Sequence, residues 1–133
     1  ITLTVGCSVS SADTCPFIDV TRVAGELYPY HYVAAAYQCG FTEGTSANRF
    51  SPYRTLSRAQ LITMVVRAAQ LQEPPDGYAP PFGNFSATHY PYARAAAYAG
   101  LLDGVVGMGP DYDFLAPASR AEVCLLLYAL LLQ

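Results

Sequence analysis

The chain has 133 residues, of which 53% are hydrophobic and 13% are charged, and its net charge is −3 at pH 7. This length and this apolar content are enough for one compact domain with a real core, and they exclude a disordered protein. The seven basic residues are spread singly along the chain, which excludes the concentrated positive surface that nucleic-acid-binding proteins present.

Residues 1–16 are predicted to form an N-terminal arm. The chain begins with Ile rather than Met, so we interpret it as processed or as an excerpt of something longer. Its first residues, ITLTV, alternate as a strand does, yet the chain offers no clear strand partner. Either a neighbouring chain pairs with this strand, or the segment is a frayed end.

Two Ala-rich helices are predicted, over 31–41 and over 91–101. Each is closed by a glycine, Gly40 in the first and Gly100 in the second, that can adopt the left-handed conformation of a helix C-terminus. A Phe-Ile-Asp-Val turn at 17–20 precedes the first helix. The matching pieces indicate an internal repeat.

Each Ala-rich helix is followed by a second helix with a clear start signal. Ser57 and Gln60 form a capping box, and Ser119 with Glu122 repeats it with the same Arg-Ala pair between them. After the first box, one buried stripe is expected at helical spacing, made of Leu61, Met64, Val65, Ala68 and either Leu71 or Gln72. Pro74 and Pro75 mark the end of this helix, and a Pro/Gly-rich linker leads to the second repeat.

The last helix is apolar nearly all round, because residues 123–132 contain no charged side chain. It is too short to span a bilayer. A helix without a polar face has to be surrounded, either by its own domain or by a neighbouring subunit.

These pieces, in this order and spacing, resemble an S-layer homology domain, a module of bacterial cell-surface proteins. The first repeat carries the resemblance at 17–20, Gly40, Gly44, Phe50-Ser-Pro52 and 56–60. In the second repeat, Phe82-Gly-Asn-Phe85 stands where Phe-Ile-Asp-Val stood, and Tyr112 takes the place of Phe50. The family commonly has three repeats and a Trp before the first helix; this chain has two repeats and tyrosines in that region.

The resemblance implies a mainly α fold, in which tandem helix-loop-helix repeats pack as a helical bundle with a short extended N-terminal arm. The expected organisation is an arm at 1–16, a first repeat at 17–72, a linker at 73–81 and a second repeat at 82–133.

Arg58 and Arg120 are the strongest candidates for ligand contact. Each is the first residue after a helix cap, where a cation opposes the helix dipole. The same unfavourable choice made twice suggests that each guanidinium pairs with an anion outside its own helix. The resemblance implies that this anion is a pyruvylated wall polysaccharide. The alternative is an internal ion pair, with Asp19, Glu43 or Asp103.

Five further residues are candidates for the same ligand. Backbone at Gly40 and Gly100 can be approached closely by a carbohydrate, and the rings of Tyr32 and Tyr92 can stack on a sugar, although most of the tyrosines are expected to be core or interface. Asp19 is expected mainly to cap the approaching chain, with a secondary role as a ligand contact.

Four cysteines in a chain that resembles an exported module imply an oxidising compartment. A bridge between Cys7 and Cys15, closing a short loop in the arm, is the first expectation. Cys39 and Cys124 are then either buried thiols or a second bridge between the repeats. The spacing of cysteines and histidines gives no support to a zinc site.

No phosphate-binding loop, nucleophile elbow or catalytic pair is evident, so we expect neither an enzyme nor a cofactor. The predicted function is a secreted module that anchors a bacterial surface protein to anionic cell-wall polysaccharide, without a membrane span. The alternative is a structural subunit of a surface layer or filament, whose arm joins neighbouring subunits. The low charge and the apolar last helix favour self-association; the paired arginines favour anchoring.

Overall fold

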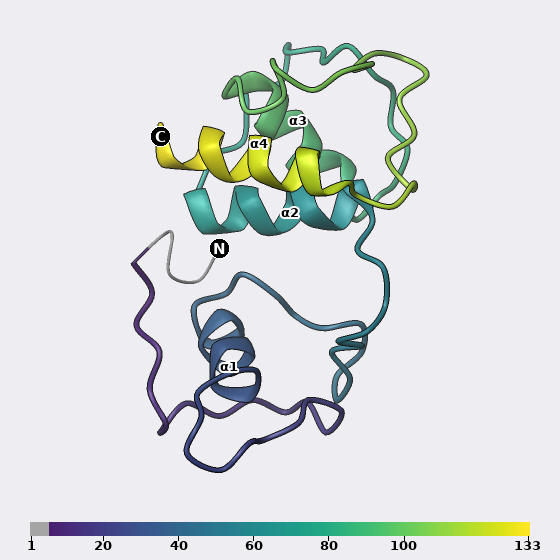
Figure 1. The fold of residues 1–133 in the computed structure, drawn as a ribbon. Helices are drawn as coiled ribbons and strands as arrows, with labels where there is room; N and C mark the ends of the chain where they lie inside the picture. The colour runs from purple at the N-terminus through teal and green to yellow at the C-terminus, as the bar shows by residue number, and fades with distance from the viewer. Residues whose placement is uncertain (1–5) are drawn as a thin grey trace. The chain divides into compact units, whose positions relative to one another are not determined.

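A computed structural model describes residues 6–133, which form four helices (Figure 1). They are α1 (Tyr30–Gln38), α2 (Arg58–Ala69), α3 (Tyr90–Tyr98) and α4 (Arg120–Leu131). Within 6–133 there are isolated bridges but no strand, and no helix there is long and apolar enough to cross a membrane. The mainly α fold is confirmed. The strand expected at 1–5 lies outside the described residues.

The chain divides into two compact units, Ile1–Arg54 and Thr55–Gln133. This boundary falls inside the first sequence repeat, 17–72, because α1 belongs to the first unit and α2 packs in the second. The boundary between the packed units therefore differs from the boundary expected between the repeats.

Unit 1 is built around α1 and the ring of Phe17. That ring lies 5.3 Å from the ring of Tyr37 and 5.5 Å from that of Phe50. Gly44 has φ +78°, and a Cβ there would lie 2.4 Å from a carbon of Phe17. Only glycine fits this turn, because it combines the left-handed backbone with the close ring.

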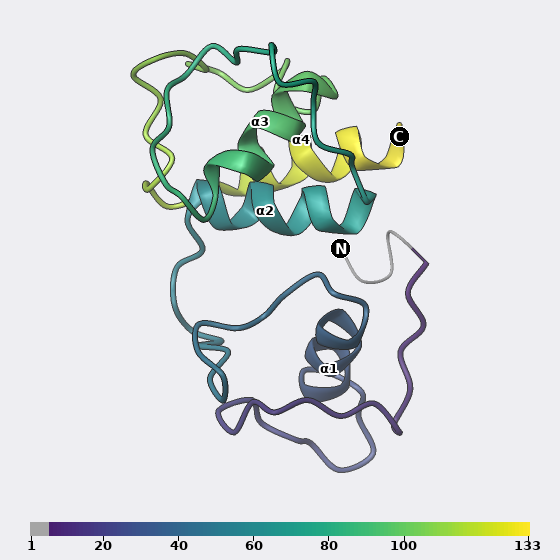
Figure 2. The ribbon, with the colours of Figure 1, turned by 180° about the vertical axis from the view of Figure 1, so that it is seen from behind.

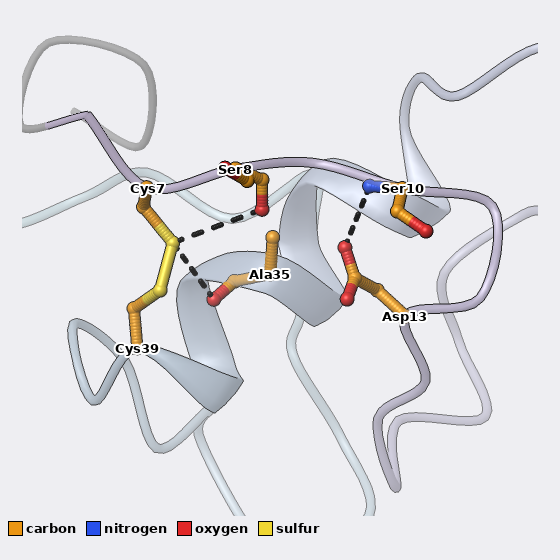
Figure 3. Close-up of a disulfide and its surroundings, with 6 residues drawn as sticks. All are labelled: Cys7, Ser8, Ser10, Asp13, Ala35 and Cys39. Atoms are coloured by element: carbon orange, nitrogen blue, oxygen red, sulfur yellow. Dashed lines mark hydrogen bonds between the residues drawn. A yellow bond between two sulfur atoms is a disulfide. The ribbon is translucent and has the colours of Figure 1, made fainter.

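The N-terminal arm lies along α1, and a disulfide joins Cys7 to Cys39 (Figure 3). Gln38 donates to the carbonyl of Thr14 at 2.8 Å, and the Tyr30 hydroxyl lies 3.2 Å from the backbone nitrogen of Cys15. The arm is therefore held at both ends of the helix. With 32 residues separating the cysteines, the bridge is expected to contribute about 3 to 4 kcal/mol by restricting the unfolded chain.

The expected pairing of Cys7 with Cys15 is wrong. Cys15 is held near Tyr30, the first residue of α1, whereas Cys7 reaches the C-cap Cys39. Cys15 packs instead against the core cluster of unit 1 around Phe17 and Tyr30. Cys15 and Cys124 are free thiols, so the second bridge that the sequence left open is not formed; Cys124 is exposed rather than buried.

In unit 2, α2 packs against both α3 and α4, and α2 and α4 lie side by side and run in the same direction (Figures 1 and 2). The expected single stripe of α2 is too narrow. Ile62, Thr63 and Val66 are buried as well, and Met64 is only half-buried. The reason is that neighbours cover α2 on more than one side.

The segment before α4 closes the start of α2. The backbone N–H groups of Arg58 and Ala59 donate to the carbonyls of Ala116 and Phe114, each at 2.9 Å. These are two of the donors that a helix N-terminus leaves without an intrahelical partner. The loop before α4 therefore completes the N-terminus of α2.

Phe114, and not Tyr112, packs on Phe82, as Phe50 packs on Phe17 in unit 1. Its ring lies 4.8 Å from that of Phe82 and stacks on Phe85 at 3.9 Å. Tyr112, which the resemblance places where Phe50 stands, lies instead in a polar cluster with Arg58 and Glu122.

Candidate functional site

Arg58, at the start of α2, forms an ion pair with Glu122 in the first turn of α4. Its Nε lies 2.9 Å from Oε2, and its Nη2 donates to Oε1 at 3.0 Å. Nη1 donates to the carbonyl of Asp113 at 3.2 Å. The side chains of the pair are 25% and 17% exposed. The anion outside its own helix, which the sequence predicted for Arg58, is therefore supplied by this chain.

Tyr112 completes this polar cluster. The Arg58 guanidinium carbon lies 4.6 Å from the centre of its ring, and its hydroxyl donates to Glu122 at 3.1 Å. Burial, and then the charge of Glu122, raise the pKa of Tyr112 to about 12. Burial of Glu122 raises the pKa of its carboxyl, but the hydrogen bonds it accepts, first from Arg58, outweigh this and lower the pKa overall.

The sequence predicted an internal ion pair as the alternative for Arg58, with Asp19, Glu43 or Asp103 as the partner. An internal pair is present, but its anion is Glu122. One signal in the sequence could have found it. The box residue is Gln60 in α2 and Glu122 in α4; Gln60 accepts from the backbone of Ser57 at 3.0 Å, whereas Glu122 turns to Arg58 and to the Ser119 hydroxyl. Glu122 carries a negative charge where Gln60 is neutral. A cation near Glu122 could therefore have been expected, whereas none was needed near Gln60.

Arg120, which repeats the position of Arg58, is exposed. Within the part of the chain that the structure describes, its guanidinium has no hydrogen bond or ion pair. Its charge therefore faces solvent at the N-terminus of α4, where it opposes the helix dipole.

A groove of about 450 Å³ lies where the end of α2 meets the start of α3. Tyr92 and Arg67 stand in it, with Nη2 of Arg67 donating to the Tyr92 hydroxyl at 3.1 Å and its guanidinium carbon 5.2 Å from the ring centre. The apolar lining comes from Val66, Leu71, Pro91 and Ala95, and further polar lining from Gln70, Glu73 and Thr88. An aromatic ring, a cation, a carboxylate and an amide in one groove suit a polar ligand with an apolar face, as a sugar has.

His89, the N-cap residue of α3, links this helix to α2. Its Nδ1 lies 2.8 Å from the hydroxyl of Thr63, the buried polar residue of α2. Burial, and then the nearby charge of Arg67, lower the pKa of His89, which favours its neutral form. Sequence reasoning overlooked both His89 and Arg67, because neither stands in a recognisable motif.

Of the other predicted residues, Asp19 acts mainly within the fold. Its carboxylate accepts from the backbone N–H groups of Phe50 and Ser51 at 2.9 and 2.8 Å, and these bonds, first that from Phe50, lower its pKa. Gly40 and Gly100 have φ of 81° and 80°, as expected for residues that end helices. The half-buried Tyr32 lies 6.3 Å, ring to ring, from Tyr28 in unit 1.

The predicted ligand-binding residues of unit 2 do not lie together at one site. Arg58 begins α2, whereas the groove around Tyr92 lies at the other end of that helix, which by its 12 residues is about 18 Å long. Within the described residues, no group of three His, Cys, Asp or Glu side chains could hold a metal ion.

Known proteins resemble this chain in two ways. Residues 25–62 match the family model of the S-layer homology domain. The chain is also 30% identical over 95 residues to an endoglucanase of Bacillus sp. (strain KSM-635), a match that covers 71% of this chain and 10% of that protein. The chain therefore spans about a tenth of the length of this relative. The stretch from Gly25 to Ile62, which includes α1 and the start of α2, is thus the part of this chain that resembles the S-layer homology domain.

Proposed function

We propose that this chain is a non-catalytic module that anchors a secreted bacterial protein to anionic polysaccharide of the cell wall. The observation that carries the proposal is the S-layer homology domain at 25–62, a module typical of bacterial cell-surface proteins. The small share of the endoglucanase that the chain matches also fits a module attached to a larger protein.

Arg120 and Tyr92 are the contacts we place first. Arg120 is exposed, carries a charge at a helix N-terminus and needs an anion. Tyr92 stands in a groove with a cation, a carboxylate and an amide, where a sugar ring can stack while its hydroxyls bond to the polar side chains.

Arg58 has a smaller proposed share in binding. Of its five N–H groups, those on Nε, Nη1 and Nη2 that face Glu122 and Asp113 are already used, which leaves two for a ligand. An incoming anion would also meet the carboxylate of Glu122. Gly40, Gly100, Tyr32 and Asp19 are proposed as secondary contacts through backbone approach, stacking and hydrogen bonding.

Sedimentation with purified bacterial cell walls tests the proposal. The intact chain should sediment with native walls and stay in solution with walls stripped of their anionic polysaccharide. Arg120→Ala and Tyr92→Ala should each weaken binding about tenfold, since hydrogen bonds to charged groups contribute roughly 1.5 to 3 kcal/mol. Arg54→Ala and Tyr98→Ala, which change exposed residues of the same types, are the matched controls. Equal binding to native and stripped walls would contradict the proposal.

A second candidate, a self-assembling subunit of a surface layer or filament, is favoured by one observation. Tyr128 and Leu131 in the C-terminal half of α4, and its C-cap residue Leu132, are between 62% and 68% exposed. Electron microscopy of the protein alone should show ordered sheets or filaments if this candidate is correct. The joining role proposed for residues 1–5 concerns a segment outside the described residues.

A further inference from the structure

One face of α4 is exposed at the positions where the equivalent residues of α2 are buried. In α2, Ala59, Ile62 and Val66 are 1%, 2% and 3% exposed. The equivalent positions after the Ser-Arg-Ala start of α4 are Ala121, Cys124 and Tyr128, and all three are exposed. A helix of the same kind is therefore covered in one place and bare in the other. Exposed apolar faces of this sort mark interaction surfaces.

The bare residues form a seam. Ala121, Cys124, Tyr128 and Leu131 follow one another at intervals of three, four and three residues, which is the spacing that lines up side chains where two helices pack along their length. Leu132 lies beside this seam and is 68% exposed. The surface is thus shaped to receive another helix rather than a loop or a small molecule.

We propose that this helix is α4 of a second copy, packed antiparallel about a two-fold axis at the level of Leu126. This register places Ala121 opposite Leu131 of the other copy, and Cys124 opposite its Tyr128. Each small side chain then meets a large one, as packing at close range requires, and the sulfur meets an aromatic ring, a favourable contact. The seam is complementary to itself in this register.

Charge selects the antiparallel direction. The charged residues of α4 are Arg120 and Glu122, both in the first turn, and Glu122 is already paired with Arg58. In a parallel pair, two Arg120 side chains would meet at two positive helix ends. In an antiparallel pair, each Arg120 faces the C-terminal end of the other helix, where a cation is favourable.

The expected dimer is weak. One seam of 12 residues per copy buries less than a standard interface of roughly 1,600 Å², so dissociation on the order of tens of micromolar is expected. This inference does not depend on wall binding, because it concerns the protein alone.

Sedimentation equilibrium of the intact chain, over concentrations from well below to well above that range, tests the dimer. The mass should rise from monomer to dimer, and Tyr128→Glu should weaken association at least tenfold by placing a charge in the seam. Val106→Glu is the matched control, since Val106 is 93% exposed in unit 2 and lies outside α4; it should associate as the original does. A monomer at every concentration, or a dimer unaffected by Tyr128→Glu, would overturn the proposal.

Disulfide trapping tests the register independently. In a Cys15→Ser background, a chain with Cys124 is mixed with a chain carrying Cys124→Ser and Tyr128→Cys. The antiparallel register predicts that the mixed disulfide forms at least several times faster than either symmetric one, and mass spectrometry distinguishes the three products. Faster symmetric bridges would indicate another arrangement and overturn the register. If Tyr128→Glu instead abolished wall binding and left the mass of the free protein unchanged, the face would belong to the wall, and the proposal would be wrong.

Discussion

Helices α2 and α4 begin alike and end in different surroundings. Both start with Ser-Arg-Ala, and in both the serine hydroxyl accepts from the backbone N–H three residues on, at 3.1 Å. Yet seven residues of α2 are buried and only Leu126 and Leu130 of α4. Helix α4 is the more apolar of the two. The comparison teaches that apolar content predicts which helix needs a neighbour, but not whether the chain itself provides one.

The largest expected difference between the two helices concerns leucine truncation. Leu61→Ala should lower the free energy of unfolding of unit 2 by about 2 to 5 kcal/mol, because Leu61 is 2% exposed and its removal leaves a cavity. Leu131→Ala, at 64% exposure, should change it by about 0.5 kcal/mol or less. Urea denaturation followed by circular dichroism measures both, at a concentration where the chain is monomeric. Equal losses would show that α4 is as well covered as α2.

The next difference concerns the two arginines. Arg58→Ala should cost about 1 to 3 kcal/mol of stability, because it leaves the largely covered carboxylate of Glu122 without its cation. Arg120→Ala should change stability by about 0.5 kcal/mol or less, since that side chain is exposed and unpaired within the described residues. Thermal unfolding of both variants makes the comparison; a large loss for Arg120→Ala would reveal a structural partner.

The same pair has a pH signature. The pKa of Glu122 is lowered in the folded state, so its contribution to stability is present above its unfolded pKa of about 4.3 and is lost as pH falls through the folded pKa. Arg58→Ala should therefore flatten the acid side of the stability profile. Asp19, whose pKa is also lowered, keeps a contribution of the same sign in unit 1. An unchanged acid limb would show that the pair does not depress the pKa of Glu122.

The smallest expected difference is between the two caps. Ser57→Ala and Ser119→Ala should each cost about 1 kcal/mol, because each removes one hydrogen bond to an unpaired N–H of a helix start. Ser→Thr at either position, which keeps the hydroxyl, is the control. Chemical denaturation measures the costs. If Ser57→Ala lowered the free energy of unfolding several times more than Ser119→Ala, the value of the cap would depend on how buried the serine is and not only on its local hydrogen bond.

Much of the candidate site was visible in the sequence, but not its internal pairing. The arginines were identified from an unfavourable position next to a helix start, which is a local property. The partner of Arg58 is 64 residues away, and Glu122 had already been assigned to a capping box. Tyr92 was identified by residue type, whereas the groove around it depends on how the end of α2 meets α3. The disulfide was missed because the sequence does not show that the arm lies along α1.

The sequence by itself determined the helices, their caps and their closing glycines, because hydrogen bonds within three or four residues and backbone conformation decide those features. It also determined the likeness of residues 25–62 to the S-layer homology domain. Only the tertiary structure decided which cysteines join, which anion Arg58 meets, that Phe114 packs on Phe82, and that α2 is covered where α4 is bare. Each of these features depends on contacts between residues far apart in the chain. The start signals of α2 and α4 are alike, so they do not reveal which neighbours each helix has.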